Sequence, residues 1–271
     1  MKRFFNLFIH KYLRVPYRLH VHFDQNPKKP RATVVLLHGM GNSGASWDAV
    51  VKKLPDDLRV ISIDLLGFGK SPSPRWMKYD IKIQAKSVIA TLLPLGIRQP
   101  MIIVGHSMGS LTAVEIAKRY PIIIKSLILC SPPFYNVSEK KTLLPSQNTI
   151  LRQFYQFVIK NPQTLVSAAP LAVSLRIVGK SFNVTSDNVA VYLAALESSI
   201  LRQSSLEDVK KLRKPIQLLH GVFDPIVIKK NLDDVVAVNN RVSLKLVAAG
   251  HELMDGYIPA VVKAIKADVT N

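Results

Sequence analysis

A serine between two glycines is the part of this sequence whose residue types and spacing could do chemistry. It stands in "VGHSMGS" (104–110), directly after the apolar run "MII". A strand followed by Gly-x-Ser-x-Gly and a helix makes a sharp turn, which exposes the serine at the carboxyl end of a sheet. Gly105 and Gly109 remove side chains where strand and helix crowd together. The placement favours Ser107 as a nucleophile, which needs a neighbouring base to remove its proton.

A histidine and an aspartate in suitable positions follow later in the chain. His251 comes after the last predicted strand in "AAGHEL", and Asp224 follows the preceding one in "LLHGVFDPIV". The imidazole would act as the base, and the carboxylate would orient it and stabilise its cation. An aspartate before a proline is also a common turn former. The order Ser107, Asp224, His251 nevertheless matches the order of a Ser-Asp-His triad on such a sheet.

Acyl chemistry also needs donors for a tetrahedral oxyanion. The backbone N–H of Met108, which follows the serine, is one candidate, and Met40 in the glycine-rich loop "HGMGNSGASW" (38–47) is the other. We expect further substrate contacts from Gly39, Trp47, Phe134 and Val222. The pattern implies no metal and no cofactor.

Short apolar runs alternate with helical patterns along the chain. Six runs indicate strands buried on both faces: 33–39, 59–64, 101–106, 126–131, 216–221 and 243–250. Helical spacing occurs between them, with Asp80 as a predicted N-cap, and residues 17–25 alternate as an antiparallel edge strand would. The sequence therefore predicts an α/β fold with a mostly parallel central sheet and helices on both faces.

Residues 134–205 break this alternation. Helical patterns near 151–158 and 189–196, without a clear strand, predict a helical lid inserted between core segments 17–133 and 206–271. Many apolar side chains there suggest an apolar acyl pocket. The insertion also carries seven Lys or Arg residues against three acidic ones. A solvated basic face is the ordinary interpretation of these charges, and a preference for substrates with an anionic end is the sharper prediction.

The charge of the chain is strongly positive. It has 271 residues, 37 Lys+Arg against 18 Asp+Glu, a net charge of +19 and one cysteine, Cys130, expected to be buried. No zinc spacing, P-loop or RNA-binding aromatic motif is present, so specific nucleic-acid binding is not expected. A single cysteine suits a cytoplasmic location. Residues 1–16 form a basic amphipathic segment that could lie on an anionic membrane or pack on its own domain.

Taken together, the chain resembles the α/β-hydrolase fold superfamily over about residues 17–268. The resemblance rests on "HGMGNSGASW", "DLLGFGKS" (64–71), "GHSMGS", "GVFDPIV" and "AGHEL". It implies a serine enzyme, because Ser107 disfavours members with an aspartate nucleophile, and it implies a structural role for Asp64. Ser110 departs from the Gly-Gly that often ends the family's elbow.

The expected function is hydrolysis of a small-molecule acyl substrate through an acyl-enzyme, with carboxylesterase activity first. Carbon–carbon bond hydrolysis of ring-cleavage products is second, and thioesterase, haloperoxidase-like or peptidase activity stays open. A non-catalytic binding protein on the same scaffold is the alternative from another class. The sequence leaves the oligomeric state open.

Overall fold

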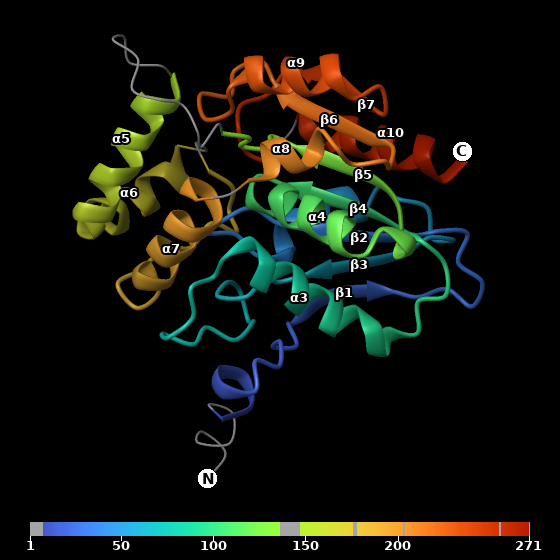
Figure 1. Ribbon diagram of the computed structural model, residues 1–271, viewed down its shortest axis with the longest axis horizontal. Helices are drawn as coiled ribbons and strands as arrows, with labels where there is room; N and C mark the ends of the chain where they lie inside the picture. The colour runs from blue at the N-terminus through green and yellow to red at the C-terminus, as the bar shows by residue number, and fades with distance from the viewer. Residues whose placement is uncertain (1–7, 136–146, 176–177, 203, 255, 271) are drawn as a thin grey trace.

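A seven-stranded sheet forms the centre of the protein (Figure 1). The computed structural model describes residues 8–135, 147–175, 178–202, 204–254 and 256–270. The strand order is β1-β3-β2-β4-β5-β6-β7, and only β1 pairs antiparallel to its neighbour. The predicted fold class is thereby confirmed. The strands are β1 (Val21–Gln25), β2 (Thr33–Leu37), β3 (Arg59–Ile63), β4 (Met101–His106), β5 (Ile124–Cys130), β6 (Ile216–Gly221) and β7 (Val242–Val247).

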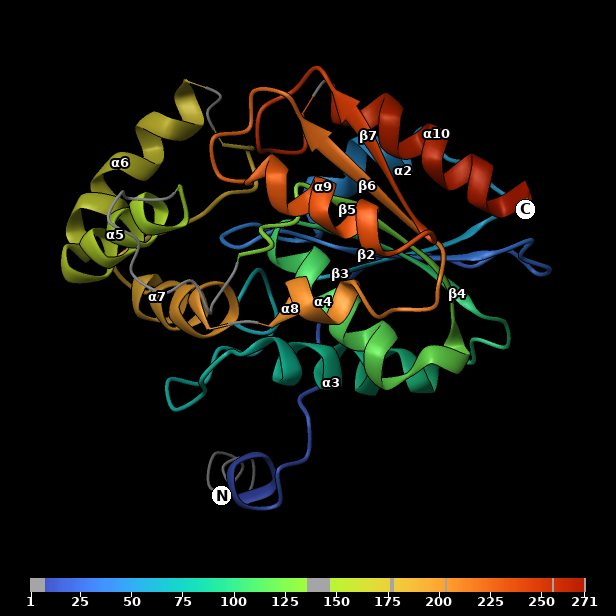
Figure 2. The same cartoon turned by 45° about the horizontal axis from the view of Figure 1, so that its top comes forward.

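Helices cover both faces of the sheet, as Figure 2 shows. One face packs against α3 (Ile81–Leu92), α4 (Met108–Arg119), α8 (Ser205–Val209) and α9 (Lys229–Val238). The other packs against the 3₁₀ turn η2 (Gly44–Trp47), α2 (Asp48–Val51) and α10 (Tyr257–Thr270). Because alternate strand residues point to opposite faces, the sheet supplies both cores, and its central strands β2, β3 and β4 are buried at every position.

Three helices inserted after β5 stand beyond the carboxyl ends of the parallel strands. They are α5 (Gln147–Lys160), α6 (Pro162–Ser174) and α7 (Val189–Ala195), which continues into the π-helical turn η5 (Leu196–Leu201). The backbone N–H of Asn183 donates to the carbonyl of Gly41 at 2.8 Å, so the insertion contacts the loop after β2. The structure thus places a helical segment over the sheet edge where the predicted chemistry lies.

Several local predictions can be compared with the structure directly. Asp80 caps α3, since its carboxylate accepts the Ile83 N–H at 2.9 Å, and Cys130 is fully buried. The expectation that the last strand is buried on both faces is wrong for β7, because it is the sheet's edge and Ser243 and Leu246 are exposed. Helices α6 and α9 were not predicted.

Within the described ranges, every helix is too short or too polar to cross a bilayer.

The N-terminal prediction falls partly outside the description. Residues 1–7 of the expected amphipathic segment lie outside the described residues, and a short π-helical turn, η1 (Phe8–Tyr12), follows them. The backbone then runs without regular structure to β1, and Figures 1 and 2 place η1 well away from the sheet.

The elbow glycines lead to a stability prediction. A Cβ on Gly109 would lie 2.2 Å from the Leu37 carbonyl oxygen, and one on Gly105 would lie 2.5 Å from the Gly109 carbonyl oxygen. Both clashes are with backbone, which cannot rotate away. Gly109→Ala should therefore lower the free energy of unfolding by about 1–3 kcal/mol or more, measured by urea denaturation. The matched control is Gly179→Ala, whose Cβ would meet its nearest atom at 3.8 Å; equal midpoints for the two variants would contradict the account.

Candidate active site

Ser107 occupies a strained turn between β4 and α4. Its φ of 50° and ψ of −117° lie in a region that L-residues avoid, and its N–H donates to the Cys130 carbonyl at 2.9 Å. Such strain persists only where the surrounding structure imposes it, and it concentrates at functional sites. On either side of this turn, Gly105 packs against the Gly109 backbone so closely that a Cβ on Gly105 would lie 2.5 Å from the Gly109 carbonyl oxygen. The turn presents the hydroxyl at the carboxyl edge of the sheet.

The structure brings the three predicted side chains together. The Ser107 Oγ lies 3.0 Å from His251 Nε2, and His251 Nδ1 lies 2.9 Å from Asp224 Oδ2. The His251 side chain is 11% exposed and that of Asp224 is fully buried. Since an ionised carboxylate only accepts, Nδ1 carries the proton and donates it to Asp224. Nε2 of a neutral ring is then an acceptor, and the Ser107 hydroxyl donates to it.

Charge and burial act in opposite directions on this pair. Burial favours the neutral form of His251, but the hydrogen bond to Asp224 and its negative charge outweigh burial and raise the pKa of the imidazole. Burial likewise favours protonated Asp224, yet bonds from His251, Ser131 and the Ile226 N–H hold the pKa of this carboxyl far below its usual range. At neutral pH the aspartate is therefore charged and able to stabilise an imidazolium.

A second chain of hydroxyls ends on the same carboxylate. Ser131 Oγ lies 2.6 Å from Asp224 Oδ2 and 2.7 Å from the Tyr257 hydroxyl, and both Ser131 and Tyr257 are fully buried. A serine has one proton to donate, and the carboxylate can only accept it. Tyr257 must therefore donate to Ser131. Ser131 adopts a φ of 46°, a second strained serine directly after a strand.

Two further contacts hold the segment around His251 in place. His106 Nε2 lies 2.8 Å from the His251 carbonyl oxygen and donates to it, across 145 residues of sequence. The Asn42 amide donates to Glu252 Oε2 at 3.3 Å, which links the segment to the loop after β2. These contacts position the main chain on both sides of the imidazole.

The predicted oxyanion loop lies beside the serine. A Cβ on Gly39 would lie 3.2 Å from the Ser107 Cβ, so the backbone at Gly39 closely approaches the Ser107 side chain. Met108 is the first residue of α4, where backbone N–H groups lack partners within the helix. His38 accepts from the Leu65 N–H at 2.8 Å through Nε2, and burial lowers its pKa to about 4, so it stays neutral. The oxyanion roles of Met40 and Met108 remain predictions.

The Asp64 carboxylate also positions the glycine-rich loop after β2. Its two carboxylate oxygens accept from the Gly44 N–H at 2.6 Å and the Lys70 N–H at 2.8 Å. His20 Nδ1 lies 3.0 Å from Asp64 Oδ2. Asp64 therefore ties together the loops after β2 and β3, and this arrangement suits the structural role that the resemblance implied.

The other predicted substrate contacts have different surroundings. Phe134 is fully buried in the apolar cluster that contains Met108 and reaches the inserted helices, and Val222 is 49% exposed near Asp224. Trp47 does not fit its prediction. It is fully buried in the opposite core with Val261 of α10, so its role is packing; its position in the glycine-rich loop was misleading because the loop turns into η2 beneath the sheet edge.

Sequence reasoning missed Ser131, Tyr257 and His106 as partners of the site. A usable signal existed for Ser131, because it directly follows β5, the strand between those that carry Ser107 and Asp224. His106 stands inside the elbow motif itself. Tyr257 had no signal, since only the packing of α10 brings its hydroxyl to this edge.

With the geometry established, comparison with known proteins identifies the family. The profile of the "alpha/beta hydrolase fold" family matches residues 32–255. The chain belongs to this family. Solved structures agree in fold: an esterase from Exiguobacterium antarcticum has a TM-score of 0.71 at 16% identity, covering 94% of this chain and all of that one. A thermophilic esterase from Thermogutta terrifontis has a TM-score of 0.65 at 22% identity, covering 87% and 88%.

Two curated relatives show how far the sequence likeness extends. A "probable lysophospholipase BODYGUARD 4" of Arabidopsis thaliana is 33% identical over 123 residues, which is 45% of this chain and 30% of that protein. The chain thus matches less than a third of that relative. A pimeloyl-(acyl-carrier protein) methyl ester esterase of Pseudoalteromonas atlantica is 27% identical over 226 residues, covering 78% of this chain and 84% of that protein.

The Ser131 contact predicts a measurable loss of stability. Ser131→Ala removes a donor from the buried Asp224 carboxylate and the acceptor of the Tyr257 hydroxyl, so unfolding should cost about 1–3 kcal/mol less in urea denaturation. Ser87→Ala is the matched control, because the Ser87 hydroxyl is also buried but has no hydrogen-bond partner among the described residues. Equal stabilities of the two variants would show that the hydroxyl chain contributes nothing.

Proposed function

We propose that the protein is a serine hydrolase that cleaves carboxylic esters through a covalent acyl-enzyme. The observation that carries this proposal is the continuous hydrogen-bond chain from Ser107 through His251 to Asp224. A hydroxyl, a base and a buried carboxylate in this order are what nucleophilic acyl transfer requires.

The reaction follows from the direction of these hydrogen bonds. His251 Nε2 takes the Ser107 proton as the oxygen attacks the ester carbonyl, and the resulting imidazolium is stabilised by Asp224. The ring then gives its proton to the leaving alcohol, which leaves an acyl group on Ser107. A water molecule, deprotonated by the same nitrogen, attacks the acyl carbonyl; the ring returns the proton to Ser107 as the acid departs.

The oxyanion would be stabilised by backbone donors. In the proposal these are the N–H groups of Met40 and Met108, and support comes from the close approach of Gly39 to Ser107 and from the position of Met108 at the start of α4. The partial positive charge of a helix N-terminus adds to the effect. Loss of one such donor typically costs about 2.7–4 kcal/mol of transition-state stabilisation.

An apolar acyl group is the substrate class that the surroundings favour. The apolar cluster containing Met108 and Phe134 includes Val158 and Val191 from the inserted helices, which we propose act as a lid. A cavity of about 650 Å³ lies between the loop after β2 and the insertion, bordered by Asn42, Val173 and Glu252, but neither Ser107 nor His251 lines it. The esterase and lysophospholipase names of the relatives support carboxylic esters over carbon–carbon bonds.

The first prediction of this proposal concerns the nucleophile. Ser107→Ala should reduce kcat for p-nitrophenyl butyrate by a factor of about 10⁶, because no other group on the chain replaces the hydroxyl. Ser243→Ala, in an exposed position of β7, is the control and should keep full activity. Turnover that survives in Ser107→Ala, with the fold intact by circular dichroism, would exclude the proposed mechanism.

The second prediction concerns pH. Only neutral His251 can act as the base, so kcat/KM should fall as pH decreases through the pKa of His251. Since Asp224 raises this pKa, the fall should be centred above the value of about 6.5 for a free histidine. In Asp224→Asn the raising charge is gone and burial acts alone, so NMR titration of the imidazole should show a lower pKa. An unchanged pKa would contradict the assigned role of Asp224.

A further inference from the structure

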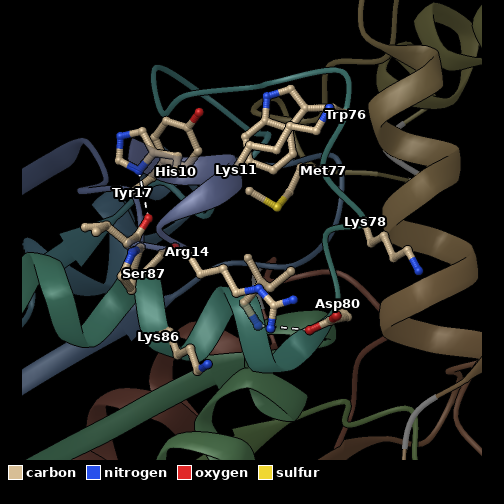
Figure 3. A pocket seen from close by; sticks show the side chains of 13 residues that line it. His10, Lys11, Arg14, Tyr17, Trp76, Met77, Lys78, Asp80, Lys86 and Ser87 are labelled. Carbon is tan, nitrogen blue, oxygen red and sulfur yellow. Dashed lines mark hydrogen bonds between the residues drawn. The ribbon is translucent and has the colours of Figure 1, made fainter. Parts of the chain in front are cut away.

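A cavity of about 530 Å³ lies at the N-terminal end of the described chain (Figure 3). Residues 10–17 form one wall, the loop 76–80 forms another, and α3 forms the floor. His10 stacks on Tyr17 with ring centroids 3.6 Å apart, and its Nδ1 lies 2.7 Å from the Val15 carbonyl oxygen. The N-terminal segment is thus folded against itself at this cavity. None of the residues placed in the active site lines it.

The cavity is strongly cationic. Lys11, Arg14, Lys78 and Lys86 line it, against one carboxylate, Asp80, which is engaged as the cap of α3. None of the four cations has a carboxylate within 4.0 Å among the residues that the structure describes. Like charges gathered without carboxylate partners favour an anionic ligand.

A buried hydroxyl marks the same cavity independently of the charges. Ser87 is fully buried and lines the cavity, yet its Oγ has no hydrogen-bond partner among the described residues. Buried polar atoms in proteins are nearly always paired, so this hydroxyl is free to donate a hydrogen bond to a ligand in the cavity. Arg14 adds a second irregularity, because it holds a φ of 55° without being glycine. Strain of this kind is retained where function requires it.

The N-terminal segment beside the cavity exposes apolar side chains to solvent, and we call this group the apolar rim; Val15 is its member that also lines the cavity. Four large apolar side chains of the N-terminal segment are exposed by 45–65%: Phe8, Tyr12, Leu13 and Val15. Single exposed apolar residues are ordinary, but four within eight residues, next to cations without carboxylate partners, form the pattern of an interfacial membrane contact. A soluble phosphate ester would account for the cations and the hydroxyl but would leave this apolar rim in water.

We propose that this cavity binds the phosphate group of an anionic phospholipid and docks the protein on a lipid surface. Lys11, Arg14 and Lys86 supply the positive charge, and the Ser87 hydroxyl donates to a phosphate oxygen. The apolar rim enters the boundary between headgroups and acyl chains. One wall also contacts the inserted helices, since Ser199 Oγ donates to the Tyr79 carbonyl at 2.5 Å, so docking holds those helices near the lipid.

The test measures binding, and its outcome does not depend on the proposed hydrolysis. The 271-residue chain carrying Ser107→Ala, so that no lipid is cleaved, is co-sedimented with vesicles of phosphatidylcholine alone or with vesicles that also contain one fifth phosphatidic acid. Lys11→Gln/Lys86→Gln should weaken binding to the acidic vesicles about thirty-fold, because each basic residue near such a surface contributes about 1 kcal/mol of binding free energy. Ser87→Ala, which changes no charge, should weaken it several-fold.

The matched control is a double variant that loses the same charge at a site remote from the cavity. Lys263→Gln/Lys266→Gln changes two exposed lysines of α10 and should leave binding within about threefold of the parent, because charges beyond a Debye length are screened. If both double variants lost vesicle affinity equally, binding would depend on the overall positive charge of the protein, and the proposed site at this cavity would be wrong. The protein could instead bind inorganic phosphate saturably, lose this binding in Ser87→Ala and show no binding to vesicles. That result would contradict a lipid ligand and indicate a soluble phosphate ester.

Discussion

A buried, charged carboxylate is the constraint on which this site depends. Burying an ion is costly unless donors replace its water, and Asp224 has such donors on both oxygens. Oδ2 accepts from His251 and Ser131, and Oδ1 accepts from the N–H groups of Ile226 and Val227 at 2.8 and 3.1 Å. These donors come from three different parts of the chain, so the charge links the end of β5, the turn after β6 and the segment after β7. The imidazole is oriented as a consequence of satisfying that charge.

The order of the strands explains how residues far apart in the sequence form one site. Ser107, Ser131, Asp224 and His251 follow β4, β5, β6 and β7 in turn, and these four strands are neighbours in the sheet. Parallel strands end at one edge, so residues as much as 144 positions apart meet there without a dedicated scaffold. The two strained serines stand at the first two of these ends. The inserted helices stand beyond this edge, and we propose that they select the substrate.

Much of this arrangement could be predicted from the sequence, and the reasons are local. Apolar runs of strand length identified β2 to β6, because strands buried on both faces leave no alternation, and turn motifs at their ends identified Ser107, Asp224 and His251. The predicted substrate contact of Trp47 was wrong because a loop motif does not show on which side of the sheet its last residue packs. Helix α6 was missed since Pro162 and Pro170 resemble breaks, although Pro162 starts the helix. Tyr257 depends on tertiary packing, which no local pattern records.

The account rests on Ser107 being made nucleophilic by the ring of His251. The most direct measurement is labelling of the intact protein with a fluorophosphonate, followed by mass spectrometry of its peptides, because this probe forms a bond only with an activated serine. We predict a single adduct on the peptide that contains Ser107, lost when His251 is replaced by alanine. A folded protein that stays unlabelled, or that carries the adduct on another serine, would contradict the account.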